Sequence, residues 1–130
     1  MVLEPRTVPV KASAKLIFII EDDTDFVDFL VRFLTYETEY DVAVVFDGYQ
    51  ALMATKVVKP HIFILDYMLP DMNGIDLYDQ LQKSEETANI PTIMLSAWLP
   101  SKEAQERKVV GIHKPFSLEE LLNSIDVLLA

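Results

Sequence analysis

Five short apolar segments, separated by stretches with helical spacing, constrain the fold of this chain more than any other feature. They are rich in β-branched and aromatic residues and comprise Leu16–Ile20, Val42–Phe46, Ile62–Leu65, Thr92–Leu95 and Val109–Ile112. Continuous apolar runs of this length are typical of strands covered on both faces. Strands that alternate with helices form a parallel sheet with right-handed crossovers. The sequence therefore predicts a doubly wound α/β fold with a five-stranded parallel sheet.

Helical patterns between the segments predict the layers on either side of the sheet. Apolar residues after the first segment recur at three- and four-residue spacing, behind a cap at Thr24 or Asp25. The second helix is expected to begin at Asp47 and the third at about Ile75. The last helix begins behind Ser117, which is followed three positions later by a glutamate, as in a capping box. The apolar faces of these helices are expected to form the core.

Length and composition limit the classes of protein to which the chain can belong. Its 130 residues suit one domain, expected over residues 15–130 behind a loose leader at residues 1–14. Asp and Glu number 21 against 11 Lys and Arg, and the net charge of -10 argues against nucleic-acid binding. The absence of cysteine excludes disulfides and thiolate metal sites and fits a cytoplasmic protein. Apolar runs of about five residues are too short for membrane insertion.

Polar residues suited to chemistry follow four of the five apolar segments. In chain order these are Glu21, Asp22 and Asp23, then Asp66, then Ser96, and finally Lys114. Ligands of open parallel sheets bind beyond the carboxyl ends of the strands, near the point where the strand order reverses. With the strand order 2-1-3-4-5, these side chains meet at one rim of the sheet. Asp23 is expected to serve the helix terminus and has no metal role.

The residue types at this rim suit a metal ion and a phosphoryl group. Crowded carboxylates repel one another and need a proton or a cation, and an oxygen-only ligand set suits Mg²⁺. Lys114 adds a positive charge and Ser96 a hydroxyl donor, both of which can bind phosphoryl oxygens. Asp66, which stands alone at the end of the central strand, is the expected nucleophile toward phosphorus.

Four sequence motifs resemble those of one family. LIFIIEDD, FILDYMLPDMNG, MLSA and HKPF, in this order and spacing, resemble the receiver domain of two-component response regulators over residues 15–129. The resemblance implies a flavodoxin-like fold and a phosphorelay protein that is not an enzyme, beyond catalysing its own phosphorylation and dephosphorylation. It also implies that Asp66 accepts a phosphoryl group from a histidine kinase or a histidine phosphotransfer protein.

The same resemblance implies roles for the residues around Asp66. Asp22 and Asp66 are expected to bind Mg²⁺ directly, the main-chain carbonyl of Met68 to be a third ligand, and Glu21 to act mostly through water. Ser96 is expected to move toward the phosphoryl group, and Lys114 to pair with it. In the family the peptide bond before the proline of the HKPF motif is often cis, and the same is expected here.

The chain departs from the family pattern in its second half. The segment between Ser96 and Lys114 is shorter than in the family by about one helical turn, which predicts a shortened fourth helix. Gly111 stands where receivers usually carry an aromatic residue that turns inward on activation. We expect Trp98, or a shift of the shortened segment, to take over this role. Gly74 is expected to adopt a positive φ in the loop after the acceptor.

Two other functions stay open at this point. The main alternative is a binding scaffold that keeps the receiver fold but no longer switches by phosphorylation, as Gly111 and the shortened fourth helix would suggest. A Mg²⁺-dependent phosphatase is disfavoured, because such enzymes usually have a second acid two residues after the nucleophile, where this chain has Met68.

The signal is expected to leave the domain through contacts with other proteins. Alternatively, the 130 residues are one piece of a longer regulator or hybrid kinase.

Overall fold

The centre of the molecule is a twisted parallel sheet in a computed structural model that describes residues 2–3 and 15–130. Its five parallel strands are β2 (Leu16–Ile20), β3 (Asp41–Val45), β4 (Ile62–Asp66), β5 (Thr92–Ser96) and β6 (Val110–His113). They lie in the order β3-β2-β4-β5-β6. Counted along the chain, this is the order 2-1-3-4-5, so the predicted topology is confirmed.

A sixth strand lies at the edge of the sheet. β1 (Val2–Leu3) pairs antiparallel with β3, and Val2 lies opposite Val44. The sequence pattern does not predict this strand, because two residues are too short to show an alternating pattern. The rest of the predicted leader, residues 1 and 4–14, lies outside the described residues, so the domain boundary at residue 15 stays a prediction.

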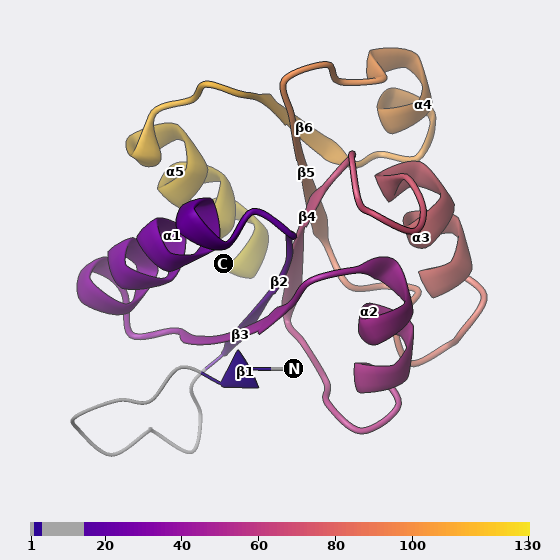
Figure 1. Cartoon of the computed structure of the whole chain (residues 1–130), viewed down its shortest axis with the longest axis horizontal. Coiled ribbons are helices and arrows are strands. Elements are labelled where there is room, and N and C mark those ends of the chain that lie inside the picture. The colour runs from indigo at the N-terminus through magenta and orange to yellow at the C-terminus, as the bar shows by residue number, and fades with distance from the viewer. Residues whose placement is uncertain (1, 4–14) are drawn as a thin grey trace.

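Helices cover both faces of the sheet (Figure 1). One layer contains α1 (Thr24–Glu37) and α5 (Leu118–Leu129), and the other contains α2 (Gly48–Ala54), α3 (Gly74–Leu81) and α4 (Ser101–Glu106). Alternate side chains of each strand enter the two layers, because successive residues of a strand point to opposite faces. In β2, for example, Ile17 belongs to the same core cluster as Leu30 of α1, whereas Phe18 belongs to the other core cluster, with Leu77 of α3.

Side-chain caps set the start of four helices. Asp23, Asp47, Asn73 and Ser117 each accept a hydrogen bond from the backbone N–H three residues later. Such caps satisfy backbone donors that have no partner in the first helical turn. The predicted cap at Ser117 is confirmed, and the helix expected to begin at Asp47 begins at Gly48, with Asp47 as its cap. For α1 the cap is Asp23 and not Thr24 or Asp25, because Asp25 already lies inside the first turn.

The shortened fourth helix is confirmed, and it is fastened to α3. The Arg107 guanidinium, just after α4, forms two hydrogen bonds with the Asp79 carboxylate, with Nε–Oδ1 at 2.7 Å and Nη2–Oδ2 at 2.9 Å. The Tyr78 hydroxyl donates to the Arg107 carbonyl at 3.2 Å. Lys108 then turns the chain into β6 with a φ of 59°. Within residues 2–3 and 15–130, no helix has the length and apolar character needed to cross a membrane.

Candidate functional site

Three carboxylates meet where β2 and β4 end. Glu21 and Asp22 follow β2, and Asp66 is the last residue of the neighbouring strand β4. One carboxylate oxygen of each residue lies within 4.8 Å of the others. The parallel pairing of the two strands aligns their carboxyl ends, so acids far apart in sequence become neighbours. The structure thus brings together the acids that the strand ends predicted.

Lys114 brings a positive charge to these carboxylates. Its Nζ lies 2.8 Å from Glu21 Oε1 and 3.6 Å from Asp66 Oδ1. It also lies 4.6 Å from the centroid of the Phe26 ring, a cation–π distance. The Lys114 N–H donates to the Ser96 carbonyl at 2.9 Å, and the Lys114–Pro115 peptide is cis, as expected. Contacts to β2, β4, β5 and α1 therefore determine where the ammonium lies.

Burial makes Glu21 the most perturbed acid of the cluster. Its carboxylate is almost inaccessible to solvent, and Oε2 accepts the Asp22 N–H at 3.0 Å. Burial raises the pKa of Glu21 to about 7; the hydrogen bond from Lys114 opposes this increase and the nearby charge of Asp66 adds to it. At Glu21, burial and the charge of Asp66 therefore outweigh the effect of the Lys114 ammonium.

The donor set fits a hard divalent cation such as Mg²⁺. All three side chains offer oxygen, and no His or Cys belongs to the cluster. Asp22 is exposed whereas Asp66 is only 8 % exposed, so an ion bound here would keep contact with water on one side. Mg²⁺ binds one or two carboxylates and retains several waters, which matches this half-open arrangement.

Ser96 lies at the end of β5, beside the strand that ends in Asp66. It is 1 % exposed, and its hydroxyl accepts the Trp98 N–H at 3.1 Å and donates to the Trp98 carbonyl at 2.9 Å. The hydroxyl therefore holds the turn after β5 in this conformation. Met68 lies two residues beyond Asp66, with its backbone bridged to Asn73 and its side chain exposed. The roles predicted for the Ser96 hydroxyl and the Met68 carbonyl stay predictions.

Gly74 is required for close packing and not for its backbone conformation. The prediction of a positive φ is wrong, because every glycine among the described residues has a negative or extended φ. A Cβ at Gly74 would lie 2.6 Å from Leu65 Cδ1 and 3.0 Å from the Asp66 carbonyl oxygen. The Gly74 N–H also donates to the Tyr67 carbonyl at 2.7 Å. The loop after Asp66 thus folds back onto its own strand, where a side chain has no room.

Asp71 is a structural residue of the site whose partners sequence reasoning missed. Its two carboxylate oxygens accept the N–H groups of Gly48 and Tyr49, both at 2.9 Å. Although partial burial acts in the opposite direction, these backbone hydrogen bonds lower the pKa of Asp71. The loop after the acceptor strand is therefore tied to the first turn of α2. The LPDMNG segment alone indicates a turn, and only the tertiary contact shows what Asp71 binds.

Leu99 occupies the space beside Gly111. A Cβ at Gly111 would collide with the Leu99 side chain. Trp98, which we expected to replace the missing aromatic residue, is 72 % exposed and lies over Tyr67, with ring centroids 6.4 Å apart. Whether Trp98 takes part in switching stays a prediction. Sequence reasoning overlooked Leu99 because a leucine in a loop carries no distinctive signal.

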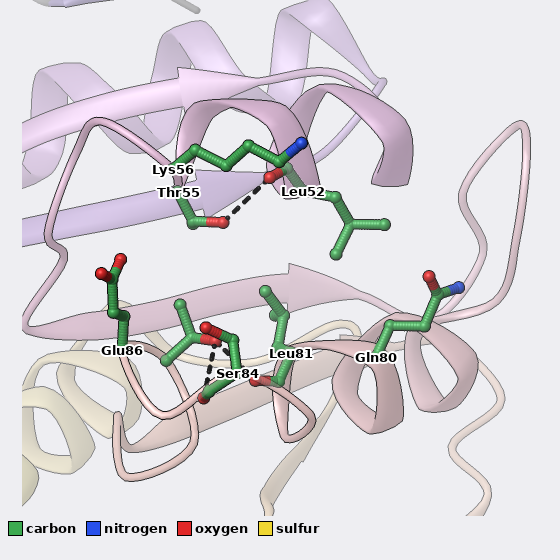
Figure 2. A pocket seen from close by; sticks show the side chains of 8 residues that line it. Leu52, Thr55, Lys56, Gln80, Leu81, Ser84 and Glu86 are labelled. Atoms are coloured by element: carbon green, nitrogen blue, oxygen red, sulfur yellow. Dashed lines mark hydrogen bonds between the residues drawn. The ribbon is translucent and has the colours of Figure 1, made fainter.

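Two pockets lie at different ends of the molecule. One of about 450 Å³ adjoins the acidic cluster, with Phe26, Phe29 and Phe116 as its apolar walls and Lys114 at its margin. The other, about 200 Å³, lies between the last turns of α2 and α3 (Figure 2). The Thr55 hydroxyl at this second pocket donates to carbonyls of its own helix, so its proton is already used. The first pocket is related to the site because Lys114, which contacts Glu21 and Asp66, belongs to its lining.

Comparison with known proteins identifies the family of the chain and agrees with its fold. Residues 17–126 match the family described as response regulator receiver domain. The chain is 34 % identical over 110 residues to the DNA-binding response regulator MtrA of Mycolicibacterium paratuberculosis, covering 82 % of this chain and 47 % of MtrA. It is 31 % identical over 111 residues to hybrid signal transduction histidine kinase D of Dictyostelium discoideum, covering 82 % of this chain and 7 % of that kinase. The chain thus spans half or less of the length of these curated relatives.

Solved structures share the architecture. A CheY-like receiver domain protein from Methanospirillum hungatei JF-1 superimposes with a TM-score of 0.82 at 26 % identity, covering 90 % of this chain and 94 % of that one. The receiver domain of sensor histidine kinase PA1611 from Pseudomonas aeruginosa PAO1, solved with magnesium coordinated in its active site cleft, gives a TM-score of 0.74 at 22 % identity. That match covers 90 % of this chain and 98 % of the PA1611 domain. The family match over residues 17–126 and the shared sheet architecture agree, and the chain belongs to the response regulator receiver domain family of two-component signalling.

Proposed function

We propose that this chain is a phosphoacceptor of a two-component phosphorelay and that Asp66 is the residue that becomes phosphorylated. The observation that carries the proposal is the meeting of Glu21, Asp22 and Asp66 within 4.8 Å, with the Lys114 ammonium 3.6 Å from Asp66. An aspartate that only caps a helix or shapes a turn needs no cation beside it. A carboxylate that attacks phosphorus needs positive charge nearby, because the incoming phosphoryl oxygens carry negative charge.

The residues of the chain divide the chemistry among them. An Asp66 carboxylate oxygen forms the new bond to phosphorus while the bond from phosphorus to the donor's imidazole nitrogen breaks, and that nitrogen keeps the electron pair. Lys114 lies close enough to shift from Glu21 and Asp66 toward a phosphoryl oxygen, and Ser96 offers a hydroxyl once it leaves Trp98. Asp22, Asp66 and the Met68 carbonyl would hold Mg²⁺, with Glu21 acting through water, and the ion would supply positive charge for the remaining oxygens.

The surface around the site fits a protein as phosphoryl donor better than a free small molecule. Apolar side chains surround the acidic cluster: Phe26, Phe29 and Phe116 line the adjoining pocket, and Met68 and Trp98 are 65 % and 72 % exposed. Exposed apolar surface of this kind around a polar centre favours a macromolecular partner. We therefore propose a histidine kinase or a histidine phosphotransfer protein as donor, in the cytoplasm, acting on a domain that spans residues 15–130.

The binding-scaffold alternative has less support. A scaffold that had lost phosphorylation would have no need to keep Asp66, Ser96 and Lys114 together with two further acids. Gly111, which suggested the alternative, affects only how the signal leaves the domain, and Leu99 fills its surroundings.

A phosphorylation assay tests the proposal directly. The chain is incubated with Mg²⁺ and acetyl phosphate, and intact-mass spectrometry is expected to find one added phosphoryl group, which peptide mapping assigns to Asp66. Asp66→Asn should abolish it, whereas Asp25→Asn, an exposed acid in the first turn of α1, should leave it unchanged. A phosphoryl group that persists in Asp66→Asn would contradict the proposal. Addition of beryllofluoride should change Trp98 fluorescence in the wild type and in Asp25→Asn but not in Asp66→Asn.

A further inference from the structure

An exposed apolar line runs along the outer face of α2. Tyr49, Met53 and Val57 are 64 %, 44 % and 83 % exposed. They are spaced four residues apart, so Tyr49 and Met53 lie on one face of α2 and Val57 continues that line in the turns that follow the helix. α2 lies at one end of its helical layer (Figure 1). Single exposed apolar residues are ordinary, but a continuous line of them marks a contact surface.

The two ends of this line carry opposite charges. Asp47 and Asp71 lie at the start of α2, where Asp71 binds the backbone N–H groups of the first turn. Lys56 and Lys59 are exposed beyond its end. In a chain with a net charge of -10, these two lysines place positive charge beside apolar surface. The surface thus has an acidic end, an apolar middle and a basic end.

A surface with an acidic end, an apolar middle and a basic end is complementary to a second copy of itself that is rotated by a two-fold axis. Met53 is halfway between Tyr49 and Val57, so a two-fold axis through Met53 sets the two lines antiparallel. Tyr49 then meets Val57 of the partner subunit, and the acidic end meets the partner's basic end. Two-fold contacts require this self-complementarity. We propose that a second copy of this chain docks on the Tyr49–Met53–Val57 face of α2, with the two helices antiparallel.

The size of the surface determines the expected strength of the contact. Standard interfaces bury about 800 Å² per partner, and a short helix that contributes three apolar side chains reaches well below this. The dimer is therefore expected to be concentration-dependent, with a dissociation constant of about 10 μM or weaker. Because charges of opposite sign meet at its rim, added salt weakens it. The dimer rests on α2 and the segments at its two ends, and it does not require phosphorylation of Asp66.

Cysteine cross-linking tests the arrangement, because the chain contains no cysteine of its own. Met53→Cys, on the proposed axis, should form a disulfide-linked dimer under mild oxidation, whereas Val127→Cys, at a 74 % exposed position of α5, should stay monomeric. Residues 49 and 57 lie about 12 Å apart along the helix direction. A mixture of Tyr49→Cys and Val57→Cys should therefore cross-link to each other more than either does to itself, since a disulfide joins Cα atoms within about 7 Å.

Sedimentation of the wild-type chain over a range of concentrations completes the test. The expected result is a monomer–dimer equilibrium that Met53→Glu weakens at least about tenfold, because two carboxylates then meet on the axis. Val127→Glu should leave it unchanged, and far-UV circular dichroism checks that each variant is folded. A monomer at every concentration would overturn the proposal and leave the line to a different protein. The proposal would also be overturned if Val127→Cys formed as much disulfide-linked dimer as Met53→Cys. The same holds if Tyr49→Cys alone cross-linked as much as the mixture of Tyr49→Cys and Val57→Cys.

Discussion

The buried Glu21 carboxylate predicts an unusual dependence of stability on pH in the absence of divalent cations. Its pKa in the folded chain is about 7, against an ordinary value of 4.5. Between these two values the folded state keeps the proton that the unfolded chain releases. The unfolded state therefore binds fewer protons, and the free energy of unfolding falls as pH rises through this window and levels off above about 7. At about 1.4 kcal/mol for each pH unit, the loss over this window is at most about 3–4 kcal/mol.

Urea unfolding followed by far-UV circular dichroism measures this loss. Free energies of unfolding would be compared at several values from about pH 5 to about pH 8 in buffer with a chelator. Asp71 and Asp79, whose pKa values are lowered from 3.8, lose their stabilising effect only as pH falls below that range, so they do not mask the slope. Hydrogen bonds from backbone N–H groups lower the pKa of Asp71 against the opposing effect of burial, and the Arg107 guanidinium lowers the pKa of Asp79.

Two controls connect the slope to Glu21. Glu21→Gln keeps an oxygen that can accept the Asp22 N–H but cannot ionise, so the slope between pH 4.5 and about 7 should largely disappear. Saturating Mg²⁺ should restore stability to the wild type above pH 7, because the cation binds the ionised acids. A flat or rising stability in the metal-free wild type, or an equal slope in Glu21→Gln, would refute the reasoning.

Three further changes have defined outcomes. Asp66→Asn removes one of the crowded charges and should raise the metal-free free energy of unfolding by about 1 kcal/mol, measured by urea unfolding; a decrease would mean that the acids do not strain the fold. Gly74→Ala should lower it by about 1–3 kcal/mol, because the new methyl group meets Leu65 and backbone atoms; an unchanged midpoint would show that the loop yields freely. Met68→Glu should shorten the half-life of phosphorylated Asp66, since a carboxylate can orient water where an apolar side chain cannot; phosphate release followed over time decides this, and an unchanged half-life would contradict it.

The acids and the lysine of the site could be predicted because their position depends on the strands that carry them. Once β2, β4 and β6 are recognised as parallel strands, Glu21, Asp22, Asp66 and Lys114 must follow their carboxyl ends. The contacts of the loops could not be predicted in this way. Leu99 lies beside Gly111, for example, and this contact depends on the path of the chain through the shortened fourth helix.

Apart from the two-residue strand β1, the sequence by itself determined the order and kind of the secondary structure and the residue types at the strand ends, because apolar periodicity and helix caps act over a few neighbouring residues. Only the tertiary structure decided the burial that raises the pKa of Glu21, the attachment of Asp71 to α2 and the close packing that Gly74 permits. These features arise between segments distant in sequence. Their energies depend on how closely the packed layers approach each other, which no local pattern contains.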